Sequence, residues 1–271
     1  MASPAPGFYE TDDLGTEIYD AVAELRIPGS SVEGDVEFFR TAARRAGGPI
    51  LEVGCGTGRV AFALVEDGWE VVGLDRSAPM LALAERRRAG LAPAVAARIE
   101  LVEGDMTDFD LGRTFGLIVV PFRVFQFLLT PEAQRSSLGA LRRHLAPGGE
   151  LVIDLFDPRL DLCLPDFRTS GEPEFVRHPV TGHTVRIERL ERVNDPLRQV
   201  LDEVWCWTEI GDAGEELRSM RETLSLRWTY RWEMRHLLEL AGFEVVSEFG
   251  DFLGSPPAYG REQVWVAKRK A

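Results

Sequence analysis

The stretch ILEVGCGTGRVAFAL, residues 50–64, decides the fold of this chain. It begins with an apolar run typical of a buried strand, and the pattern from Arg59 onward is typical of a helix. An acidic residue, Glu52, precedes three alternating glycines, which are Gly54, Gly56 and Gly58. Glycine allows a sharp turn and a close approach to a ligand, and the free N–H groups at a helix start favour an anionic group. The stretch therefore predicts a strand–loop–helix unit at a nucleotide-like ligand site.

The charge and spacing of this loop favour one class of ligand over another. The dinucleotide fingerprint is G-x-G-x-x-G, but here the third glycine comes early and Arg59 stands where the fingerprint has glycine. Glu52, which we expect at the strand end facing the ligand crevice, would repel a pyrophosphate and attract a cation. S-adenosylmethionine carries a sulfonium and an ammonium, so it is the favoured ligand. An NAD-dependent Rossmann oxidoreductase is the alternative enzyme class.

The segments around this stretch alternate between strand-like and helix-like patterns. Strand patterns are PILEV, WEVVGLD, RIELVEGD, FGLIVVPF and GELVIDLF, within residues 49–156. Helical patterns start near Arg59, Ala78 and Pro131. Such alternation predicts a mainly parallel sheet with helices on both faces. The fold class is therefore α/β and Rossmann-like, with seven strands once the closing strands FEVVSEF and QVWVAKR are counted.

The pattern changes after residue 157. Long, charge-rich, alternating stretches are separated by the turn signals TG, NDP and GDAG, which predicts antiparallel strands over residues 159–229. A helix is expected over residues 230–241, ending at Gly242. We therefore divide the chain into an N-terminal helical cover of one end of the sheet (1–48), a core (49–158 and 230–271), and an antiparallel β insertion (159–229) that we expect to act as a substrate lid.

Composition excludes several classes of partner. The formal charge is -13 and the pI about 4.9, so nucleic acid and anionic membrane surfaces are repelled on average. The N-terminal sequence MASPAPGFYETDD lacks the basic and apolar regions of a signal peptide, so a cytoplasmic location is expected. The cysteines Cys55, Cys163 and Cys206 are widely spaced, which argues against a disulfide framework or a zinc site and favours buried packing.

Several segments, in order along the chain, resemble the motifs of class I S-adenosylmethionine-dependent methyltransferases. LEVGCGTGR (51–59) resembles the first motif, [DE]-x-G-x-G-x-G, and VVGLDRSAPML (71–81) resembles the second-strand motif. VEGDMTDF (102–109) resembles the third, and FGLIVVPFRVFQFL (115–128) followed by LAPGGELVIDLF (145–156) resembles the fourth and fifth strands. The resemblance implies S-adenosylmethionine as cofactor and methyl transfer as the activity.

The resemblance also implies which residues contact the cofactor. Asp75 would accept hydrogen bonds from both ribose hydroxyls, Met80 would pack near the adenine, Asp105 would reach the adenine amino group and Met106 would lie beside the ring. The full predicted set is Glu52, Gly54, Cys55, Gly56, Gly58, Asp75, Arg76, Met80, Asp105, Met106 and Pro121. Asp154 lies inside a strand pattern and is expected to be structural.

The methyl acceptor must lie beyond the end of the fourth strand, where PFRVFQF is the first candidate. Arg123 and Gln126 are polar among apolar neighbours and suited to orient a substrate; alternatively, Arg123 is ion-paired within the fold and Gln126 is solvated. Tyr9, Tyr19 and Tyr230 are further substrate-binding candidates, and His236 is expected to be a packed or surface histidine. No residue stands out as a catalytic base, and no metal site is expected.

Four tryptophans lie in or beside the insertion: Trp205, Trp207, Trp228 and Trp232. They either pack the insertion onto the core or line an aromatic acceptor pocket, where cation–π contact would suit an amine. A strand-rich lid after the fifth strand is similar to that of glycine/sarcosine and amino-sugar N-methyltransferases. We expect methyl transfer to nitrogen or oxygen of a small molecule, by a monomer or homodimer; a non-catalytic S-adenosylmethionine-binding protein is the alternative from another class.

Overall fold

A seven-stranded sheet forms the core of the protein in a computed structural model, which describes residues 8–26, 30, 32–159 and 172–270. The strands are β1 (Ile50–Val53), β2 (Val71–Asp75), β3 (Ile99–Glu103), β4 (Phe115–Val120), β5 (Leu145–Phe156), β10 (Phe243–Phe249) and β11 (Glu262–Arg269). Their order is β10-β11-β5-β4-β1-β2-β3, and β11 runs antiparallel to both of its neighbours while β1 to β5 are parallel. The predicted Rossmann-like, mostly parallel sheet is thus confirmed.

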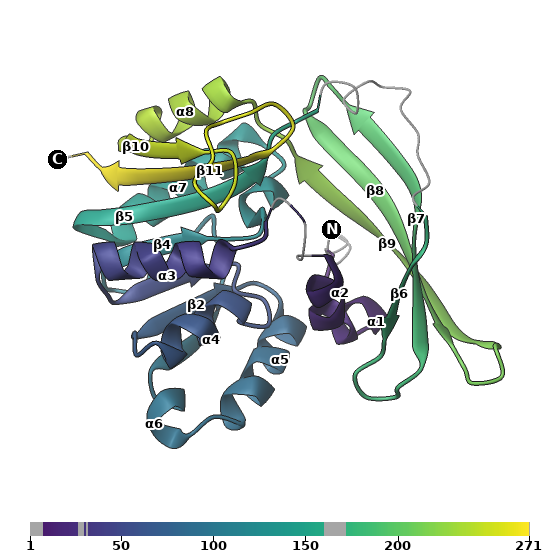
Figure 1. Ribbon diagram of the computed structural model, residues 1–271. Helices are drawn as coiled ribbons and strands as arrows, with labels where there is room; N and C mark the ends of the chain where they lie inside the picture. Colours follow the sequence, from purple (N-terminus) through teal and green to yellow (C-terminus); the bar gives the residue numbers. More distant parts are fainter. Residues whose placement is uncertain (1–7, 27–29, 31, 160–171, 271) are drawn as a thin grey trace, which may run out of the picture.

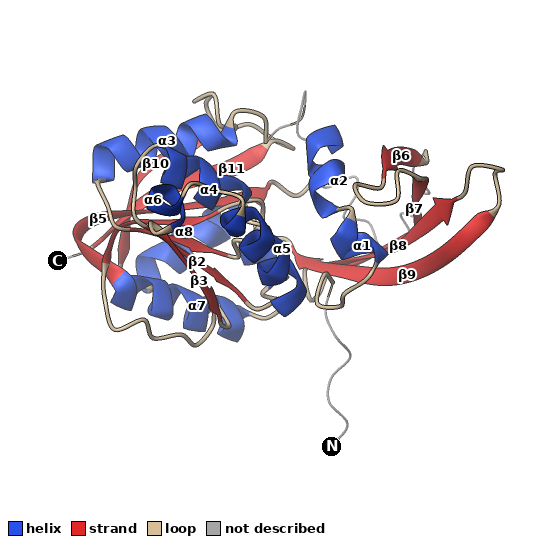
Figure 2. Ribbon diagram, turned by 90° about the horizontal axis from the view of Figure 1, so that it is seen from below, coloured by secondary structure: helices blue, strands red, loops and turns tan. Residues whose placement is uncertain are grey.

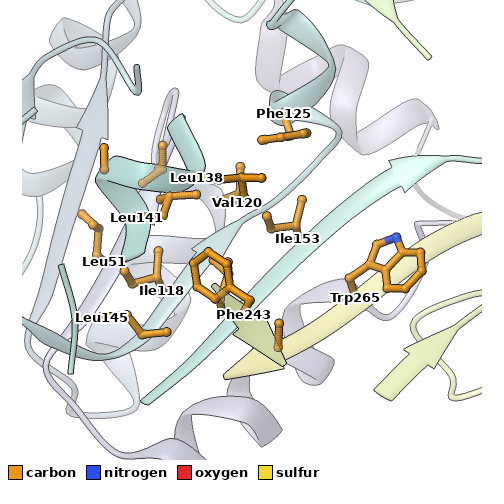
Figure 3. Packing of buried hydrophobic residues seen from close by; sticks show 14 of the residues in the cluster. Leu51, Ile118, Val120, Phe125, Leu138, Leu141, Leu145, Ile153, Phe243 and Trp265 are labelled. Atoms are coloured by element: carbon orange, nitrogen blue, oxygen red, sulfur yellow. The ribbon is translucent and has the colours of Figure 1, made fainter. Parts of the chain in front are cut away.

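Helices cover both faces of this sheet (Figure 1). One face carries α3 (Asp35–Ala46), α4 (Arg59–Glu66) and α5 (Ala78–Ala89), with the short α6 (Pro93–Ala96) beside them, and the other carries α7 (Pro131–His144) and α8 (Arg231–Leu240). Leu138 and Leu141 of α7 and Phe243 of β10 belong to the apolar layer on the second face (Figure 3). The predicted helix starts at Arg59, Ala78 and Pro131 are all confirmed. Helices lie on both faces because the apolar strands of a parallel sheet must be buried on both sides.

The predicted antiparallel insertion is a separate four-stranded sheet in the order β6-β7-β8-β9. Its strands are β6 (Glu174–Arg177), β7 (Thr184–Asp195), β8 (Val200–Ile210) and β9 (Glu216–Arg227). It stands apart from the core, with the two short helices α1 (Leu14–Glu17) and α2 (Tyr19–Arg26) between it and the core strands (Figure 1, Figure 2). One face of this sheet therefore looks toward the strand ends of the core.

The N-terminal segment contacts both sheets, and its role as a cover of one end of the core sheet stays a prediction. Its helix α3 packs on a face of the core sheet. Leu14, Ile18 and Val22 are spaced by four residues and pack on Trp207 and neighbouring apolar residues of the second sheet. The sequence period shows the apolar stripe on these helices, but it does not say which sheet the stripe will meet.

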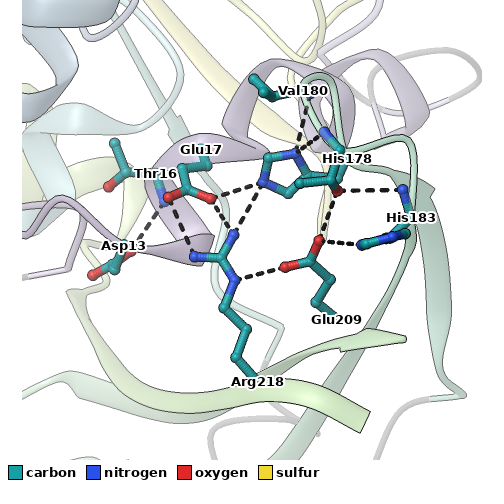
Figure 4. Close-up of polar contacts among 9 residues, drawn as sticks. Asp13, Thr16, Glu17, His178, Val180, His183, Glu209 and Arg218 are labelled. Carbon is teal, nitrogen blue, oxygen red and sulfur yellow. Dashed lines mark hydrogen bonds and ion pairs between the residues drawn. The ribbon is translucent and has the colours of Figure 1, made fainter. Parts of the chain in front are cut away.

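A polar cluster joins α1 to the second sheet (Figure 4). Arg218 of β9 pairs with Glu17 of α1 and, at 2.6 Å, with Glu209 of β8. The imidazole of His178 lies 2.7 Å from the Glu17 carboxylate, and that of His183 lies 2.9 Å from Glu209. A hydrogen bond from the Thr181 hydroxyl, together with Arg218, lowers the pKa of Glu209 to about 2. Glu209 therefore stays ionised at neutral pH, and the cluster holds α1 on the sheet.

Other sequence expectations can be checked against the described residues. Cys55 and Cys206 are buried and free, as expected, while Cys163 lies outside them. No group of His, Cys, Asp and Glu in the described ranges could hold a metal ion. No helix among those residues has the length and apolar character needed to cross a membrane.

Candidate active site

One large cavity of about 930 Å³ lies between the core and the second sheet. Its walls come from the carboxyl ends of β1, β2 and β4, from the N-terminal segment, and from the inward face of β7, β8 and β9. Pockets for small ligands measure roughly 300–1,000 Å³, so this cavity has room for a nucleoside and a second molecule. The carboxyl ends of parallel strands are where α/β sheets bind their ligands.

The three glycines of the loop after β1 have positive φ angles of 72°, 53° and 83°, for Gly54, Gly56 and Gly58 respectively. A Cβ on Gly54 would lie 2.3 Å from Val124, and one on Gly58 would lie 2.5 Å from the Phe62 ring. A Cβ on Gly56 would meet no atom within 4 Å, and Gly56 lines the cavity. Gly54 and Gly58 are therefore required by contacts within the protein, and Gly56 is the glycine that leaves room for a ligand.

Asp75 lies at the end of β2, where its carboxylate is held by two backbone donors. The Gly56 N–H donates to Oδ2 at 2.7 Å and the Ser77 N–H donates to Oδ1 at 2.8 Å. Burial raises the pKa of Asp75 from its usual value, which these hydrogen bonds oppose. Each carboxylate oxygen can accept more than one hydrogen bond, so Asp75 retains capacity for ligand hydroxyls in the cavity that it lines.

Glu52 is more deeply buried than expected and is not among the described residues that line the cavity. Its Oε2 is buried and has no hydrogen-bond partner within the described part of the chain. Burial raises the pKa of Glu52 to about 8, although Arg59 lowers it. A buried carboxylate of this kind favours a cation nearby. A pKa of about 8 leaves Glu52 mostly protonated at neutral pH, and a cationic ligand nearby would lower this pKa and stabilise the carboxylate.

These observations together test whether S-adenosylmethionine fits. The open side of Gly56 would let the cofactor come close to the backbone, and the Asp75 carboxylate suits the ribose diol. The buried acid Glu52 suits the cationic amino-acid end. Met80 and Met106 line the same part of the cavity and offer thioethers to a purine ring. The residues present fit the cofactor.

The remaining predicted cofactor residues divide into two groups. Arg76 lines the cavity and pairs with Glu10 at 2.6 Å. Four residues do not line it, which are Cys55, Gly58, Asp105 and Pro121. The Asp105 carboxylate instead accepts hydrogen bonds from the Thr107 N–H at 2.8 Å and the Thr107 hydroxyl at 2.6 Å. A contact between Asp105 and adenine stays a prediction.

The N-terminal segment contributes to the cofactor side of the cavity. The hydroxyl of Thr57 in the glycine loop donates to Asp20 of α2 at 2.6 Å, and the Ser77 hydroxyl donates to the Tyr9 carbonyl at 2.5 Å. Tyr9 and Tyr19 line the cavity, as two of the predicted acceptor residues. The bond between Thr57 and Asp20 ties α2 to the glycine loop, and the only sequence signal for it was a hydroxyl within that loop.

The other predicted acceptor residues do not all reach the cavity. Arg123 lines it and is ion-paired with the buried Glu262, as the alternative interpretation expected; its role in orienting a substrate stays a prediction. Gln126 is fully buried instead of solvated, and its amide joins β9 to β5: Nε2 donates to the Arg227 carbonyl at 3.4 Å and Oε1 accepts from the Phe156 N–H at 3.0 Å. Tyr230 is exposed at the start of α8 and lies outside the cavity lining. His236 is at the surface, as expected.

The tryptophans play different roles. Trp205, Trp207 and Trp228 line the cavity, whereas Trp232 is exposed on α8. The Trp205 ring lies 4.5 Å from the Arg26 guanidinium and 5.7 Å from that of Arg189. Cation–π contacts within the protein therefore already account for Trp205, without an acceptor amine.

We expect Asp75→Asn to weaken S-adenosylmethionine binding by about 1.5–3 kcal/mol, because charge-assisted hydrogen bonds contribute that much. Isothermal titration calorimetry measures the loss, and thermal unfolding checks that the fold survives. Asp108→Asn, at an exposed aspartate outside the cavity lining, is the matched control and should leave affinity unchanged. Equal affinity of the Asp75→Asn variant and the parent would show that Asp75 does not hold the cofactor.

The fold and this site together define the class I S-adenosylmethionine-dependent methyltransferases. Residues 50–149 match the methyltransferase domain family. The chain is 34% identical over 193 residues to a dTDP-4-amino-2,3,4,6-tetradeoxy-D-glucose N,N-dimethyltransferase of Saccharopolyspora spinosa, which covers 69% of this chain and 70% of that protein. It is 28% identical over 261 residues to a cypemycin N-terminal methyltransferase of a Streptomyces species, with 96% and 97% covered.

A solved structure supports the same assignment. The S-adenosylmethionine-bound structure of CalS10, an amino pentose methyltransferase from Micromonospora echinaspora, superimposes with a TM-score of 0.69 at 28% identity over 93% of this chain and 96% of that one. This chain therefore belongs to the S-adenosylmethionine-dependent methyltransferases. It is an enzyme of that family, and the oxidoreductase and non-catalytic alternatives are set aside.

Proposed function

We propose that this methyltransferase transfers a methyl group to an amino nitrogen of a small molecule or of the N-terminus of a short peptide. The finding that carries the proposal is the cavity itself, which the second sheet and the N-terminal helices wall in on the acceptor side. With a volume of about 930 Å³ it suits a cofactor and one compact acceptor. A folded macromolecule would not fit between these walls.

The wall opposite the cofactor side is polar. Strand pairing places Asn194, Arg192 and Arg189 of β7 beside Leu201, Glu203 and Trp205 of β8 respectively, and all of them line the cavity. The Glu203 carboxylate lies 3.0 Å from Arg192 Nε and 3.4 Å from Arg189 Nη1. Such a wall offers hydrogen bonds to an acceptor with several oxygen or nitrogen groups rather than to a hydrocarbon.

Nitrogen is favoured over oxygen because the described lining offers no evident base for a hydroxyl. The lining residues in the described ranges include no histidine, and burial raises the pKa of both Tyr9 and Tyr19. The carboxylates of Glu10, Glu174, Glu203 and Glu262 are each ion-paired with arginine, and that of Asp157 accepts hydrogen bonds from the Gly260 N–H and the Gln263 amide. A neutral amine has its own lone pair and needs no base to attack, whereas an alcohol must lose a proton.

The residues of the cavity would then act mainly by orientation. S-adenosylmethionine, when bound, supplies a methyl group activated by a sulfonium. Asp75 and Gly56 would hold the donor side, and the β7–β8 wall would hold the acceptor so that its nitrogen lies in line with the bond that breaks. Correct orientation alone supplies a large part of the rate of such bimolecular steps. The names of the amino-sugar, amino-pentose and N-terminal methyltransferase relatives agree with an amine acceptor.

The test is a panel assay with purified protein and S-adenosylmethionine. The acceptors are an amino sugar, its nucleoside diphosphate ester and a peptide with a free N-terminus, each paired with its N-acetyl or hydroxyl analogue. Mass spectrometry should show methylated product and equal S-adenosylhomocysteine for at least one amine and for none of the paired analogues. Methylation of a hydroxyl analogue in preference to its amine would reject the nitrogen assignment.

A further inference from the structure

The segment that follows β4 has an unusual backbone. Phe122 and Arg123 have φ angles of 57° and 65°, so two consecutive non-glycine residues adopt the left-handed conformation. Side chains other than glycine seldom adopt it, since their Cβ crowds the backbone, and surrounding contacts must then hold it. We call residues 121–124 the β4 turn.

A single buried carboxylate holds the β4 turn. Asp154, near the carboxyl end of β5, is fully buried; its Oδ1 accepts the Phe122 N–H at 2.9 Å and its Oδ2 accepts the Arg123 N–H at 3.0 Å. The two N–H groups point to one carboxylate because the φ and ψ angles of Phe122 set their relative direction. The sequence indicated no more than a structural role for Asp154, because nothing local links it to residues 32 and 31 positions earlier.

The β4 turn contacts both sides of the cavity. Val124 lies so close to Gly54 that a Cβ there would meet it at 2.3 Å, so the turn supports the cofactor loop. Arg123 lines the cavity beside Glu262 of β11, with which it pairs. We call the part of the cavity wall that Arg123 and Glu262 form the acceptor wall; the position of this one turn fixes it relative to the cofactor loop.

We propose that Asp154 is a positioning residue for methyl transfer: by holding the β4 turn in its left-handed conformation it aligns the acceptor wall with the cofactor loop. The inference rests on the proposed function only for its kinetic consequence. Asp154 does not line the cavity and acts through Phe122, Arg123 and Val124. A displacement of the acceptor by about 1 Å lowers the rate of an oriented reaction by about 100-fold.

The direct test is Asp154→Asn, which preserves size but turns one oxygen into an N–H donor facing a backbone N–H. We expect kcat for the best amine of the panel to fall by about 100-fold, while the Kd for S-adenosylmethionine changes by less than about threefold, a shift under 1 kcal/mol. A crystal structure of the variant should show that Phe122 or Arg123 has left the left-handed region and that the Arg123–Glu262 pair is broken. Glu150→Gln is the matched control, because Glu150 is also a buried carboxylate of β5 and lies in the middle of the strand, away from the β4 turn.

A second pair of variants separates positioning from folding. Glycine adopts positive φ without strain, so in a Phe122→Gly protein the Asp154 carboxylate is needed less to hold the left-handed conformation. In that background Asp154→Asn should reduce kcat by less than about tenfold. If Asp154→Asn alone does not fold, this pair decides. A Phe122→Gly/Asp154→Asn protein that also fails to fold would show that Asp154 is only a folding residue. An equal loss of kcat in both backgrounds would show that Asp154 does not act through the conformation of the β4 turn.

The outcomes separate this inference from the proposed function. If no amine is methylated by the parent protein, the nitrogen proposal fails, and the crystal structure of the Asp154→Asn variant alone decides the positioning role. An unchanged β4 turn in that structure, or an unchanged kcat with an active amine, would overturn the inference while leaving the proposed function intact.

Discussion

Gly56→Val should abolish measurable S-adenosylmethionine binding, with a loss of affinity of at least about 100-fold, or about 2.8 kcal/mol. The reason is steric: a Cβ on Gly56 points into open cavity, in the space assigned to the cofactor, and valine adds two further methyl groups there. Overpacking of a filled site costs about 1–3 kcal/mol and occasionally more. Calorimetric titration with S-adenosylmethionine measures the loss, and methyl transfer should disappear with it.

The control for this variant must reproduce its backbone strain. Gly56 has a φ of 53°, where valine is disfavoured whatever the space. Gly112 has a φ of 63° and is exposed, and a Cβ on it would meet nothing within 4 Å, so Gly112→Val carries similar strain away from the cavity. Gly112→Val should bind normally. Retained binding in Gly56→Val would mean that the loop does not approach the ligand.

Arg227→Ala should destabilise the protein by about 3–5 kcal/mol, because removal of one member of a buried ionic network leaves its partners uncompensated. The guanidinium donates to Gln134 of α7 at 2.9 Å, to Gln199 at 2.8 Å and to Glu233 of α8 at 2.8 Å. Arg227 ends β9 and is buried, so these bonds join the second sheet to two core helices. Thermal unfolding should show a decrease in Tm of about 10 °C.

Arg221→Ala is the matched control, since Arg221 is an exposed arginine on the same strand. Its effect should stay within about 0.5 kcal/mol. Arg227→Lys should retain the charge but lose the forked geometry that reaches several acceptors, and should lie between the alanine variant and the parent. Similar Tm values for Arg227→Ala and Arg221→Ala would show that the network does not hold the two sheets together.

The sequence by itself determined the core and the cofactor. The alternation of strand and helix periods over residues 49–157 is local, so it predicted β1 to β5, and the closing strands and the antiparallel insertion followed from the same periods. The family, the methyltransferase activity and S-adenosylmethionine were confirmed, because the motif residues lie within a few positions of a strand end whose place in a parallel sheet is fixed. The domain roles, including the lid, stay predictions.

Only the tertiary structure decided the acceptor side, and the reason is that its contacts join residues far apart in the chain. Gln126 was expected in the acceptor site but bonds to a carbonyl 101 positions away, and Arg227 reaches a glutamine 93 positions away. Tyr230 follows the insertion directly, yet the orientation of α8 leaves it exposed. Periodicity shows which residues a strand or helix buries, but it does not show which distant segment they meet, and that partner decides whether a polar side chain lines a cavity or holds the fold together.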